Sequence, residues 1–260
     1  MSVIVVRALG LVTVQDLGRP GRMHEAVPAG GALVPDRLIA ANRRVQNPDD
    51  APALEVLGQL VLRADGALEV ATDTLAARGL AAGAELAVTS EPRRVTYVAV
   101  RGGIDAPLVL GGRGALLCAG LGGLVRAGQR FATAGLPARA PAPLPAEPAG
   151  GPIRIVAGPD ADHFAAGALE ALLSADYRVL PSSDRVGTRL DGPALPRTAA
   201  SEASRPMVIG AIEVPRDGKP IVLGPEHPTT GGYPIIAVVA HDELGRLFSI
   251  RLGGSVRFTR

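Results

Sequence analysis

The sequence predicts a mainly β protein with two domains and few helices. Its apolar residues fall mostly in short, valine-rich runs bounded by glycine, proline or aspartate, which is typical of strands. Many short strands with few helices favour barrels or sandwiches over a parallel α/β sheet. Residues 136–152 are dominated by proline and alanine, a composition that forms an extended connector without its own core. We therefore expect β domains at residues 1–136 and 153–260, joined by a linker at residues 137–152.

The first domain is expected to contain five strands and one helix. The helix is expected at residues 35–45, because Pro35 suits a first turn and Leu38, Ile39 and Val45 are candidate core contacts. The strands are expected at residues 3–6, 60–63, 68–71, 85–88 and 95–100.

The second domain is expected to open with a strand at residues 153–156. A helix is expected at residues 162–173, where Phe164, Leu169, Leu172 and Leu173 approximate helical spacing. Further strands are expected at residues 177–180, 220–223, 235–239 and 255–258.

The composition limits the class of protein. The chain has 260 residues, 47% of them hydrophobic but only 3% aromatic, so the core must be aliphatic. A formal charge of +2, dispersed arginines and scarce aromatic residues argue against nucleic-acid binding. We see neither a signal peptide nor an apolar run long enough to span a membrane. The single cysteine, Cys118, lies among apolar residues, so we expect it to be buried in a cytoplasmic protein.

Lysine and histidine usage excludes several kinds of chemistry. Lys219 is the only lysine and is followed by proline, so the chain has no P-loop and no biotin-accepting lysine. The four histidines have no ligand-like spacing with one another or with Cys118, so no metal site is expected. Any nucleotide site or biotin carrier must therefore come mostly from a partner.

Three clusters could bind a ligand or carry chemistry. In the first, Gln15, Asp16 and Arg19 lie within five residues of a turn. One interpretation is a local ion pair between Asp16 and Arg19. The other is that Gln15 and Arg19 donate hydrogen bonds to a carboxylate or phosphate, for which arginine offers a two-pronged contact.

The second cluster is SDRVGTRL at residues 183–190, which contains Asp184, Arg185 and Arg189. If this segment is a strand, its two arginines are four residues apart and share a face. Two like charges together indicate an anion, which could be a substrate, a phosphate or a protein carboxylate such as Glu202 or Glu213.

The third cluster is the loop EHPTTGGYP at residues 226–234. His227 could exchange a proton near neutrality, and Thr229, Thr230 and Tyr233 supply hydroxyls. Gly231 and Gly232 could bring backbone N–H groups close to an anion. The alternative is a plain connection between strands, in which glycine and proline only form the turn.

Several short motifs occur in order along the chain. They are GLVTVQDLGRPG at residues 10–21, VRGGI at residues 100–104, SDRVGTRL at residues 183–190, GAIEVP at residues 210–215, DGKPIVL at residues 217–223 and TTGGYP at residues 229–234. Together they resemble the family of the 5-oxoprolinase C subunit, also called biotin-dependent carboxyltransferase or allophanate hydrolase subunit 2. The family includes the antagonist of a sporulation-kinase inhibitor.

The resemblance implies two cyclophilin-like β-barrel units and a role as the C subunit of a cytosolic, ATP-dependent 5-oxoprolinase, which opens pyroglutamate to glutamate. B-like and A-like partner subunits are implied. One alternative is a component that moves a carboxyl group from carboxybiotin to a urea- or amide-like acceptor. Another is a non-catalytic regulatory partner of a B-like subunit that resembles a kinase inhibitor. We expect no cofactor on this chain alone, with ATP used in the complex, or carboxybiotin held on a separate carrier.

The resemblance also directs attention to residues of the three clusters. As catalytic candidates we take His227, Thr229, Thr230 and Tyr233. As candidates for binding a small carboxylate substrate we take Gln15, Asp16, Arg19, Asp184, Arg185, Arg189, Glu213, Gly231 and Gly232. The chain departs from the family pattern in several places: Glu213 and Asp184 stand where amides are usual, His227 where arginine is common, and Gly30 and Val34 where serine and aspartate are usual.

Overall fold

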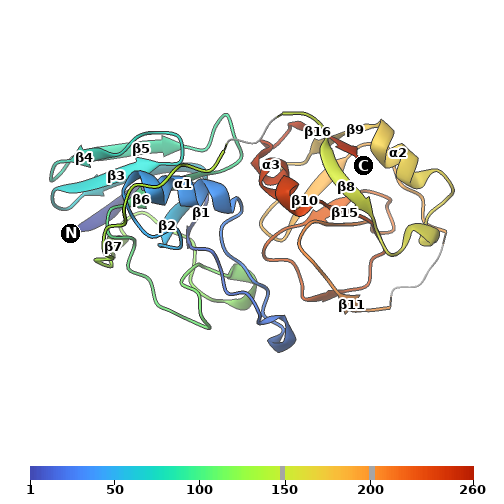
Figure 1. The fold of residues 1–260 in the computed structure, drawn as a ribbon, viewed down its shortest axis with the longest axis horizontal. Helices are drawn as coiled ribbons and strands as arrows, with labels where there is room; N and C mark the ends of the chain where they lie inside the picture. Colours follow the sequence, from blue (N-terminus) through green and yellow to red (C-terminus); the bar gives the residue numbers. More distant parts are fainter. Residues whose placement is uncertain (147–149, 199–202) are drawn as a thin grey trace. The chain divides into compact units, whose positions relative to one another are not determined.

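The structure is a computed structural model that describes residues 1–146, 150–198 and 203–260 (Figure 1). The chain divides into two compact units. We call Met1–Pro20 with Gly30–Glu147 the first unit, and Gly21–Ala29 with Pro148–Arg260 the second unit. The expected linker at residues 137–152 includes residues 147–149, which lie outside the described residues. The expected domain boundaries stay predictions.

The first unit is built around two long antiparallel strands. β1 (Ser2–Gln15) pairs with β2 (Ala53–Ala64) from Val3 opposite Ala64 to Gln15 opposite Ala53. The sheet order is β4-β3-β6-β2-β1-β7, and β5 also pairs with β2. The remaining strands are β3 (Leu68–Thr72), β4 (Arg78–Leu80), β5 (Glu85–Thr89), β6 (Thr96–Val100) and β7 (Arg130–Ala132).

Two glycines let β1 and β2 approach each other in the middle of their pairing. Gly10 lies opposite Gly58. A Cβ atom on Gly58 would lie 2.2 Å from the Leu9 carbonyl oxygen, and one on Gly10 would lie 2.3 Å from the Leu57 carbonyl oxygen. Both residues also have positive φ angles, +138° for Gly58 and +82° for Gly10. Only glycine accepts this combination, so the pair allows both strands to bend at one point.

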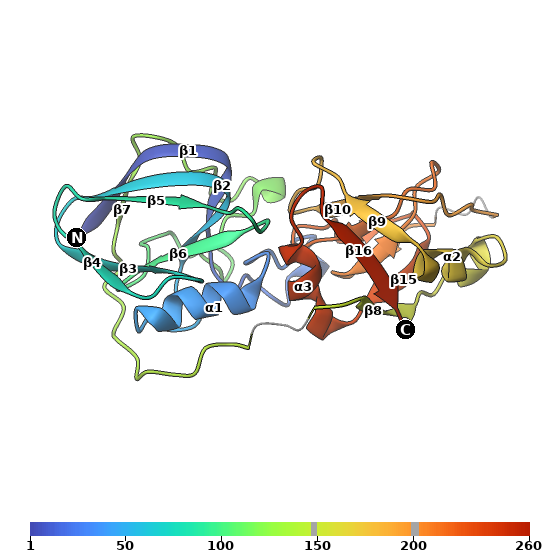
Figure 2. The ribbon, with the colours of Figure 1, turned by 90° about the horizontal axis from the view of Figure 1, so that it is seen from above.

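The core of the first unit is aliphatic, as the composition predicts. It is formed mainly by strand side chains, among them Val12, Leu54, Val56, Leu60, Leu62 and Val98, together with Ile104 from the segment after β6. The helix α1 (Pro35–Arg44) ends one residue before the predicted end and packs against β6, β3 and β2 (Figure 2). Leu38 and Val45 are buried as predicted, whereas Ile39 is half-buried.

The second unit contains a closed barrel of seven strands in the order β10-β13-β12-β15-β8-β16-β9. All neighbouring pairs are antiparallel except β16 with β8. The strands are β8 (Ile153–Ala157), β9 (Asp176–Val179), β10 (Gly187–Asp191), β12 (Ala211–Glu213), β13 (Ile221–Leu223), β15 (Ile235–Val239) and β16 (Ser255–Thr259). A separate pair joins β11 (Arg205–Pro206) to β14 (Thr230–Gly231).

Neighbouring strands of the barrel carry one row of buried side chains and an adjacent row that faces outward. Thr188, Val222, Ile212 and Ala237 are paired across β10, β13, β12 and β15, and all four are fully buried. The adjacent row contains Arg189, Ile221 and Glu213 and faces outward, since successive side chains of a strand alternate between faces.

The expected helix at residues 162–173 is wrong in length. The structure has a 3-10 turn at Ala161–His163 and a separate helix α2 (Ala168–Ser174), with Gly167 at φ +83° between them. A residue in the left-handed region cannot continue a right-handed helix. The helix α3 (Leu244–Ser249) follows β15 and was not expected.

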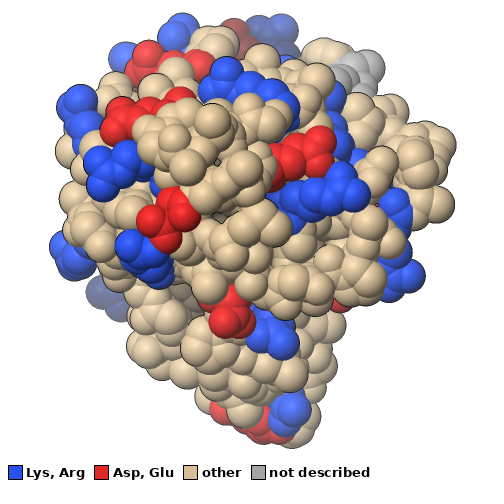
Figure 3. Space-filling view, turned by 90° about the vertical axis from the view of Figure 1, so that its left-hand side faces the viewer, with Lys and Arg blue, Asp and Glu red and all other residues tan. Residues whose placement is uncertain are grey.

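Charged side chains of both signs lie on the surface of the protein. Basic and acidic side chains are interspersed on the face shown in Figure 3. Among the described residues, no helix is both long and apolar enough to cross a membrane. Cys118 is exposed on a 3-10 turn at Leu117–Ala119, so the expectation that it is buried is wrong.

Candidate functional site

Asp16 holds the turn that follows β1. Its Oδ1 accepts a hydrogen bond from the Gly18 N–H (2.8 Å), and its Oδ2 accepts one from the Arg113 N–H (2.5 Å). The carboxylate is buried and both of its oxygens are engaged by backbone groups of this unit. Asp16 therefore joins the end of β1 to the loop at residues 109–114, a role that the backbone itself requires.

Arg19 lies inside the same loop and is 1% exposed. Its Nη2 donates to the Gly114 carbonyl oxygen (2.6 Å), and its Nε donates to the Val109 carbonyl oxygen (3.3 Å). Its Nη1 is buried and has no hydrogen-bond partner among the described residues. The alternative of an ion pair between Asp16 and Arg19 is not what the structure shows, because each side chain is bonded to backbone groups instead.

Gln15 is fully buried and does not offer its amide hydrogens to a ligand. Its Nε2 donates to Thr13 Oγ1 (3.0 Å) and to the Ala115 carbonyl oxygen (3.1 Å). The Ala115 carbonyl can only accept, which fixes the orientation of the amide. Oε1 is buried without a partner among the described residues. The expectation that Gln15 donates hydrogen bonds to a ligand is therefore wrong, because its amide hydrogens are bonded within the protein, and its remaining capacity is that of an acceptor.

A pocket of about 470 Å³ lies beside this cluster within the first unit. Asp16 and Gly18 line it from the end of β1, and Gly111 and Arg113 line it from the loop that surrounds Arg19. Leu17, Pro20, Pro48, Asp50, Ala51, Pro52, Leu108, Leu136, Pro137 and Arg139 complete the lining. Alternate residues of the loop thus face the pocket on one side and contact Arg19 on the other.

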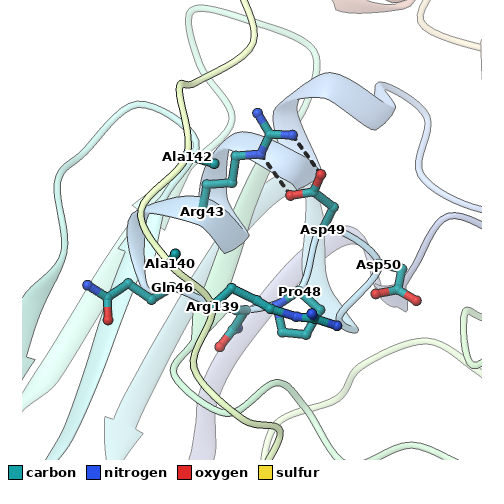
Figure 4. Close-up of a pocket in the computed structure, with 9 residues that line it drawn as sticks. Arg43, Gln46, Pro48, Asp49, Asp50, Arg139, Ala140 and Ala142 are labelled. Atoms are coloured by element: carbon teal, nitrogen blue, oxygen red, sulfur yellow. Dashed lines mark hydrogen bonds and ion pairs between the residues drawn. The ribbon is translucent and has the colours of Figure 1, made fainter.

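A second pocket, of about 290 Å³, shares Pro48, Asp50 and Arg139 with the first (Figure 4). Arg43 at the end of α1 binds Asp49 through two hydrogen bonds, from Nε (2.7 Å) and Nη2 (2.6 Å). The hydrogen bond from Arg43 lowers the pKa of Asp49 despite the opposing effect of burial. Arg43 and Asp49 are thus paired with each other, and Arg139 and Asp50 are the other charged residues that line this pocket.

Arg185 in the second unit is paired inside the protein. Its Nε donates to Glu226 Oε1 at 2.6 Å, and the two side chains are 1% and 2% exposed. The Glu226 N–H also donates to the Arg185 carbonyl oxygen (3.1 Å). Among the described residues, the carboxylate that pairs with Arg185 is thus Glu226, which was not one of the two expected partners. Glu202, one of those expected partners, lies outside the described residues.

Arg189 is exposed to solvent, unlike Arg185. It lies in β10 and is exposed, whereas Arg185 precedes the strand and is buried. The expectation that both arginines share a strand face is therefore wrong. Asp184 stabilises the turn between them, because its Oδ1 accepts hydrogen bonds from the Val186 N–H (2.8 Å) and the Gly187 N–H (3.0 Å).

Arg189 lies near Glu213 on the outside of the barrel. Both are paired with Ile221 from opposite sides, so the three side chains form one row. Burial raises the pKa of Glu213, and the charge of Arg189 opposes that shift. Glu213 is thus a half-buried carboxylate that retains its proton to higher pH than an exposed one.

His227 is buried at the start of the loop at residues 226–234. Its Nδ1 lies 2.7 Å from the Pro228 carbonyl oxygen, which makes Nδ1 the protonated nitrogen. Burial lowers the pKa of His227, and the hydrogen bond to Pro228 opposes this effect. The imidazole is therefore neutral near pH 7 and sits inside the fold.

The Thr-Thr-Gly-Gly segment is partly a strand. Gly231 pairs with Arg205 in β14, and a Cβ atom on Gly231 would lie 2.4 Å from Met207 Cε. Gly231 thus packs closely against the flexible side chain of Met207, and its φ is not in the left-handed region. Thr230 and Tyr233 are exposed, and Thr229 and Gly232 are half-buried, so hydroxyls of this loop remain accessible.

Asp160 and Arg205 support this loop and were missed by sequence reasoning. Asp160 Oδ2 accepts a hydrogen bond from the Ile235 N–H (2.8 Å), and its Oδ1 pairs with Arg205 Nη1. The only signal was the Gly158-Pro159-Asp160 turn, which indicated a change of direction and no more.

The structure thus groups the candidates by unit. Gln15, Asp16 and Arg19 form one cluster, in the first unit. In the second unit, Arg185 joins the start of the loop through Glu226, and Arg189 joins Glu213. That these groups meet in a single pocket stays a prediction.

Comparison with known proteins shows the family to which the chain belongs. The sequence model of the carboxyltransferase domain family, subdomain A and B, matches residues 25–260. The chain belongs to this family.

Three proteins are similar to this chain over at least 95% of its length. The chain is 32% identical to the 5-oxoprolinase C subunit of Escherichia coli (strain K12), over 98% of this chain and 90% of that protein. It is 29% identical to the 5-oxoprolinase C subunit of Haemophilus influenzae, over 95% of this chain and 87% of that protein. It is also 28% identical to the urea amidolyase of Lachancea kluyveri, of which it covers only 16%. The family resemblance read from the motifs is confirmed.

Solved structures agree on the fold. The protein TTHA0988 superposes on this chain with a TM-score of 0.87 at 28% identity, and this chain spans 55% of its length. The urea amidolyase of Kluyveromyces lactis has a TM-score of 0.87 at 24% identity, which shows the fold alone. The predicted fold class, mainly β with two cyclophilin-like units and few helices, is confirmed.

Proposed function

We propose that this chain is the C subunit of a 5-oxoprolinase, an ATP-dependent enzyme that opens the lactam ring of 5-oxoproline to give glutamate. The observation that carries the proposal is the identity of 32% to a 5-oxoprolinase C subunit over 98% of this chain and 90% of that protein. An alignment of this extent includes both units, so the relationship is not that of a shared domain in otherwise different proteins.

The residues present in this chain indicate which binding steps it contributes and which belong to its partners. The chain has one lysine and no phosphate-binding glycine motif, so ATP is bound mainly by partners, which we propose to be A-like and B-like subunits. This chain contributes binding groups. Arg19 supplies a buried cationic donor in the first unit, and Glu213, Arg189, Thr230 and Tyr233 supply accessible polar groups in the second. Preorganised donors of this kind stabilise the oxygen charge that develops when an amide is attacked.

Reconstitution tests the proposal. The A-like and B-like subunits of the same source are mixed with this chain, 5-oxoproline and ATP, and glutamate is measured. We expect glutamate only when all three chains are present. Full turnover in the mixture without this chain would contradict the proposal.

A second candidate is supported by the family model and by the urea amidolyases. In this alternative the chain forms part of a carboxyltransferase that moves a carboxyl group from carboxybiotin, on a separate carrier, to a urea- or amide-like acceptor. The test supplies a biotin carboxylase, its carrier, bicarbonate and ATP together with urea. Carboxylation of urea that depends on this chain, with no glutamate formed in the first assay, would favour the alternative.

A further inference from the structure

Two oppositely charged side chains of the first unit line the same pocket without pairing. Asp50 lies between α1 and β2, and Arg139 lies in the segment after β7; both line the pocket of about 470 Å³ and the adjoining pocket of about 290 Å³. Both side chains are exposed, and among the described residues neither makes a hydrogen bond or an ion pair. Figure 4 shows the Arg139 side chain extending past Pro48 toward the side on which Asp50 lies. A cation and an anion that face one pocket unpaired are complementary to a ligand that carries both charges.

The other charged groups around this junction are engaged within the protein. Arg43 and Asp49 bond each other through two hydrogen bonds. Asp16 uses both of its carboxylate oxygens to accept hydrogen bonds from backbone N–H groups. The charge of Arg139 contributes to the lowered pKa of Asp49, but the hydrogen bond from Arg43 is the larger cause. Asp50 and Arg139 are therefore the charges of the junction whose hydrogen-bonding groups are left for a ligand.

Arg113 adds a second cation to the larger pocket. Its Nη1 donates to the Ala106 carbonyl oxygen, which orients the guanidinium. A guanidinium has five N–H donors, so donors remain after this contact. Arg113 lines only the larger pocket, whereas Asp50 and Arg139 line both pockets. The second cation therefore lies on a different part of the wall from the junction.

The rest of the wall is largely apolar and is held by backbone hydrogen bonds. Leu108 and Leu136 are part of it. The Leu136 N–H donates to the Gly102 carbonyl oxygen (3.0 Å), and the Arg139 N–H donates to the Gln46 carbonyl oxygen (2.7 Å). The pocket is open in the structure as it stands, and its volume lies within the range of about 300–1,000 Å³ that is usual for small-molecule sites.

We propose that this pocket binds an α-amino acid with an acidic side chain. Asp50 accepts hydrogen bonds from the α-ammonium group, Arg139 binds the α-carboxylate, and Arg113 binds the side-chain carboxylate. The choice of glutamate within this class rests on the proposed function, because glutamate is the product of ring opening. In 5-oxoproline the nitrogen belongs to a neutral lactam, which offers Asp50 no charge. The pocket is thus a product site and not a second substrate site.

The first experiment compares three probes on the full chain by nuclear magnetic resonance titration, which detects weak binding. The probes are L-glutamate, 5-oxoproline, which lacks the ammonium group, and L-norvaline, which has the same number of carbon atoms but lacks the side-chain carboxylate. We expect glutamate to bind about tenfold more tightly than either, because each of the others loses one charge-assisted contact. Equal affinity of glutamate and either other probe, or no binding of glutamate, would overturn the proposal.

The second experiment tests the acceptor of the ammonium group. Asp50→Asn should weaken glutamate binding about tenfold and leave 5-oxoproline binding unchanged, since the lactam does not use this charge. The matched control is Glu85→Gln, which neutralises an exposed carboxylate of β5 that lines neither pocket. We expect wild-type binding in the control. An equal loss for both ligands, or an equal loss in the control, would refute the role of Asp50.

The third experiment separates the two arginines. Arg139→Gln should weaken glutamate and norvaline alike, about tenfold, because both carry the α-carboxylate. Arg113→Gln should instead remove the preference for glutamate over norvaline. The control is Arg78→Gln in β4, an exposed arginine that lines neither pocket. Unchanged affinity in Arg139→Gln, or an unchanged preference in Arg113→Gln, would contradict the assigned contacts.

Failure of this inference is distinguishable from failure of the proposed function. If the reconstituted enzyme forms glutamate but the chain does not bind it, the product site is wrong and the proposed function stands. If no glutamate is formed while the chain binds glutamate through Asp50, the proposed function is wrong and the site stands.

Discussion

Asp16 and Asp184 have the same role in different units. Each carboxylate accepts a hydrogen bond from the backbone N–H two residues ahead, from Gly18 and from Val186 respectively. Aspartate is common in turns because its side chain can replace a backbone acceptor in this way. Motif residues that look like ligand-binding acids are thus engaged by the backbone of their own turns.

The buried pair of Arg185 and Glu226 permits a sharp prediction about stability. Replacing Glu226 with glutamine removes a buried carboxylate that is paired with the Arg185 guanidinium, and we expect a loss of about 3–5 kcal/mol in the free energy of unfolding. Urea denaturation measures the change. The matched control is Asp176→Asn, which breaks an exposed pair with Arg257, where a loss of at most about 1 kcal/mol is expected. Similar losses in both variants would contradict the assigned burial.

Glu213 permits a prediction about pH. Burial raises the pKa of Glu213 in the folded protein above its ordinary value of 4.5. The folded state therefore binds this proton more tightly than the unfolded state, and the stability linked to it is lost as pH rises through the folded pKa. We expect Glu213→Gln to be more stable than the wild type at pH 7, with the difference shrinking as pH falls through the raised pKa toward 4.5. Urea denaturation across this range measures the difference. An advantage that does not depend on pH would refute the role of the charge.

The pH dependence of stability expected from His227 has the opposite direction to that of Glu213. Burial lowers its pKa from the ordinary value of 6.5, so the stability linked to it is present above that pH and is lost as pH falls. The contributions of Glu213 and His227 to stability can be distinguished because they change in opposite directions with pH.

The long pair of β1 and β2 depends on glycine at one position. In Gly58→Ala the new methyl group would meet the Leu9 carbonyl oxygen at 2.2 Å in a backbone of φ +138°. We expect a loss of about 3 kcal/mol or more, from the clash and the backbone strain together. The control is Gly66→Ala, where nothing lies within 4 Å and a change within about 0.5 kcal/mol is expected. Urea denaturation of both variants tests this, and a mild effect of Gly58→Ala would show that the strands need not approach so closely.

Strand periodicity predicted the positions of elements better than their lengths. The run at residues 235–239 coincides with β15, but residues 3–6 are only part of the 14 residues of β1. The rest of β1 contains exposed residues and a glycine bend, which break the alternation on which the prediction depends. The left-handed Gly167 divided the predicted helix for a similarly local reason.

At the scale of the whole molecule, each unit has its own buried core. We therefore predict two thermal transitions that respond to different substitutions. Gly58→Ala should lower the transition of the first unit and leave the other unchanged, while Glu226→Gln should do the reverse. Differential scanning calorimetry of the two variants measures this. A single transition that both substitutions lower equally would show that the units unfold together.

The sequence by itself determined the fold class, the aliphatic core and the family. Strand-forming runs and short motifs are local features, so they can be recognised without knowing which residues are in contact. It also named most residues of the candidate site. Only the tertiary structure decided their chemical roles. Residues distant in sequence supply the partners: Glu226 pairs with Arg185, the Ala115 carbonyl oxygen accepts a hydrogen bond from the Gln15 amide, and the Gly114 carbonyl oxygen accepts one from Arg19. A side chain's remaining hydrogen-bonding capacity depends on these contacts, and that capacity distinguishes a group that holds the backbone from one that can hold a ligand.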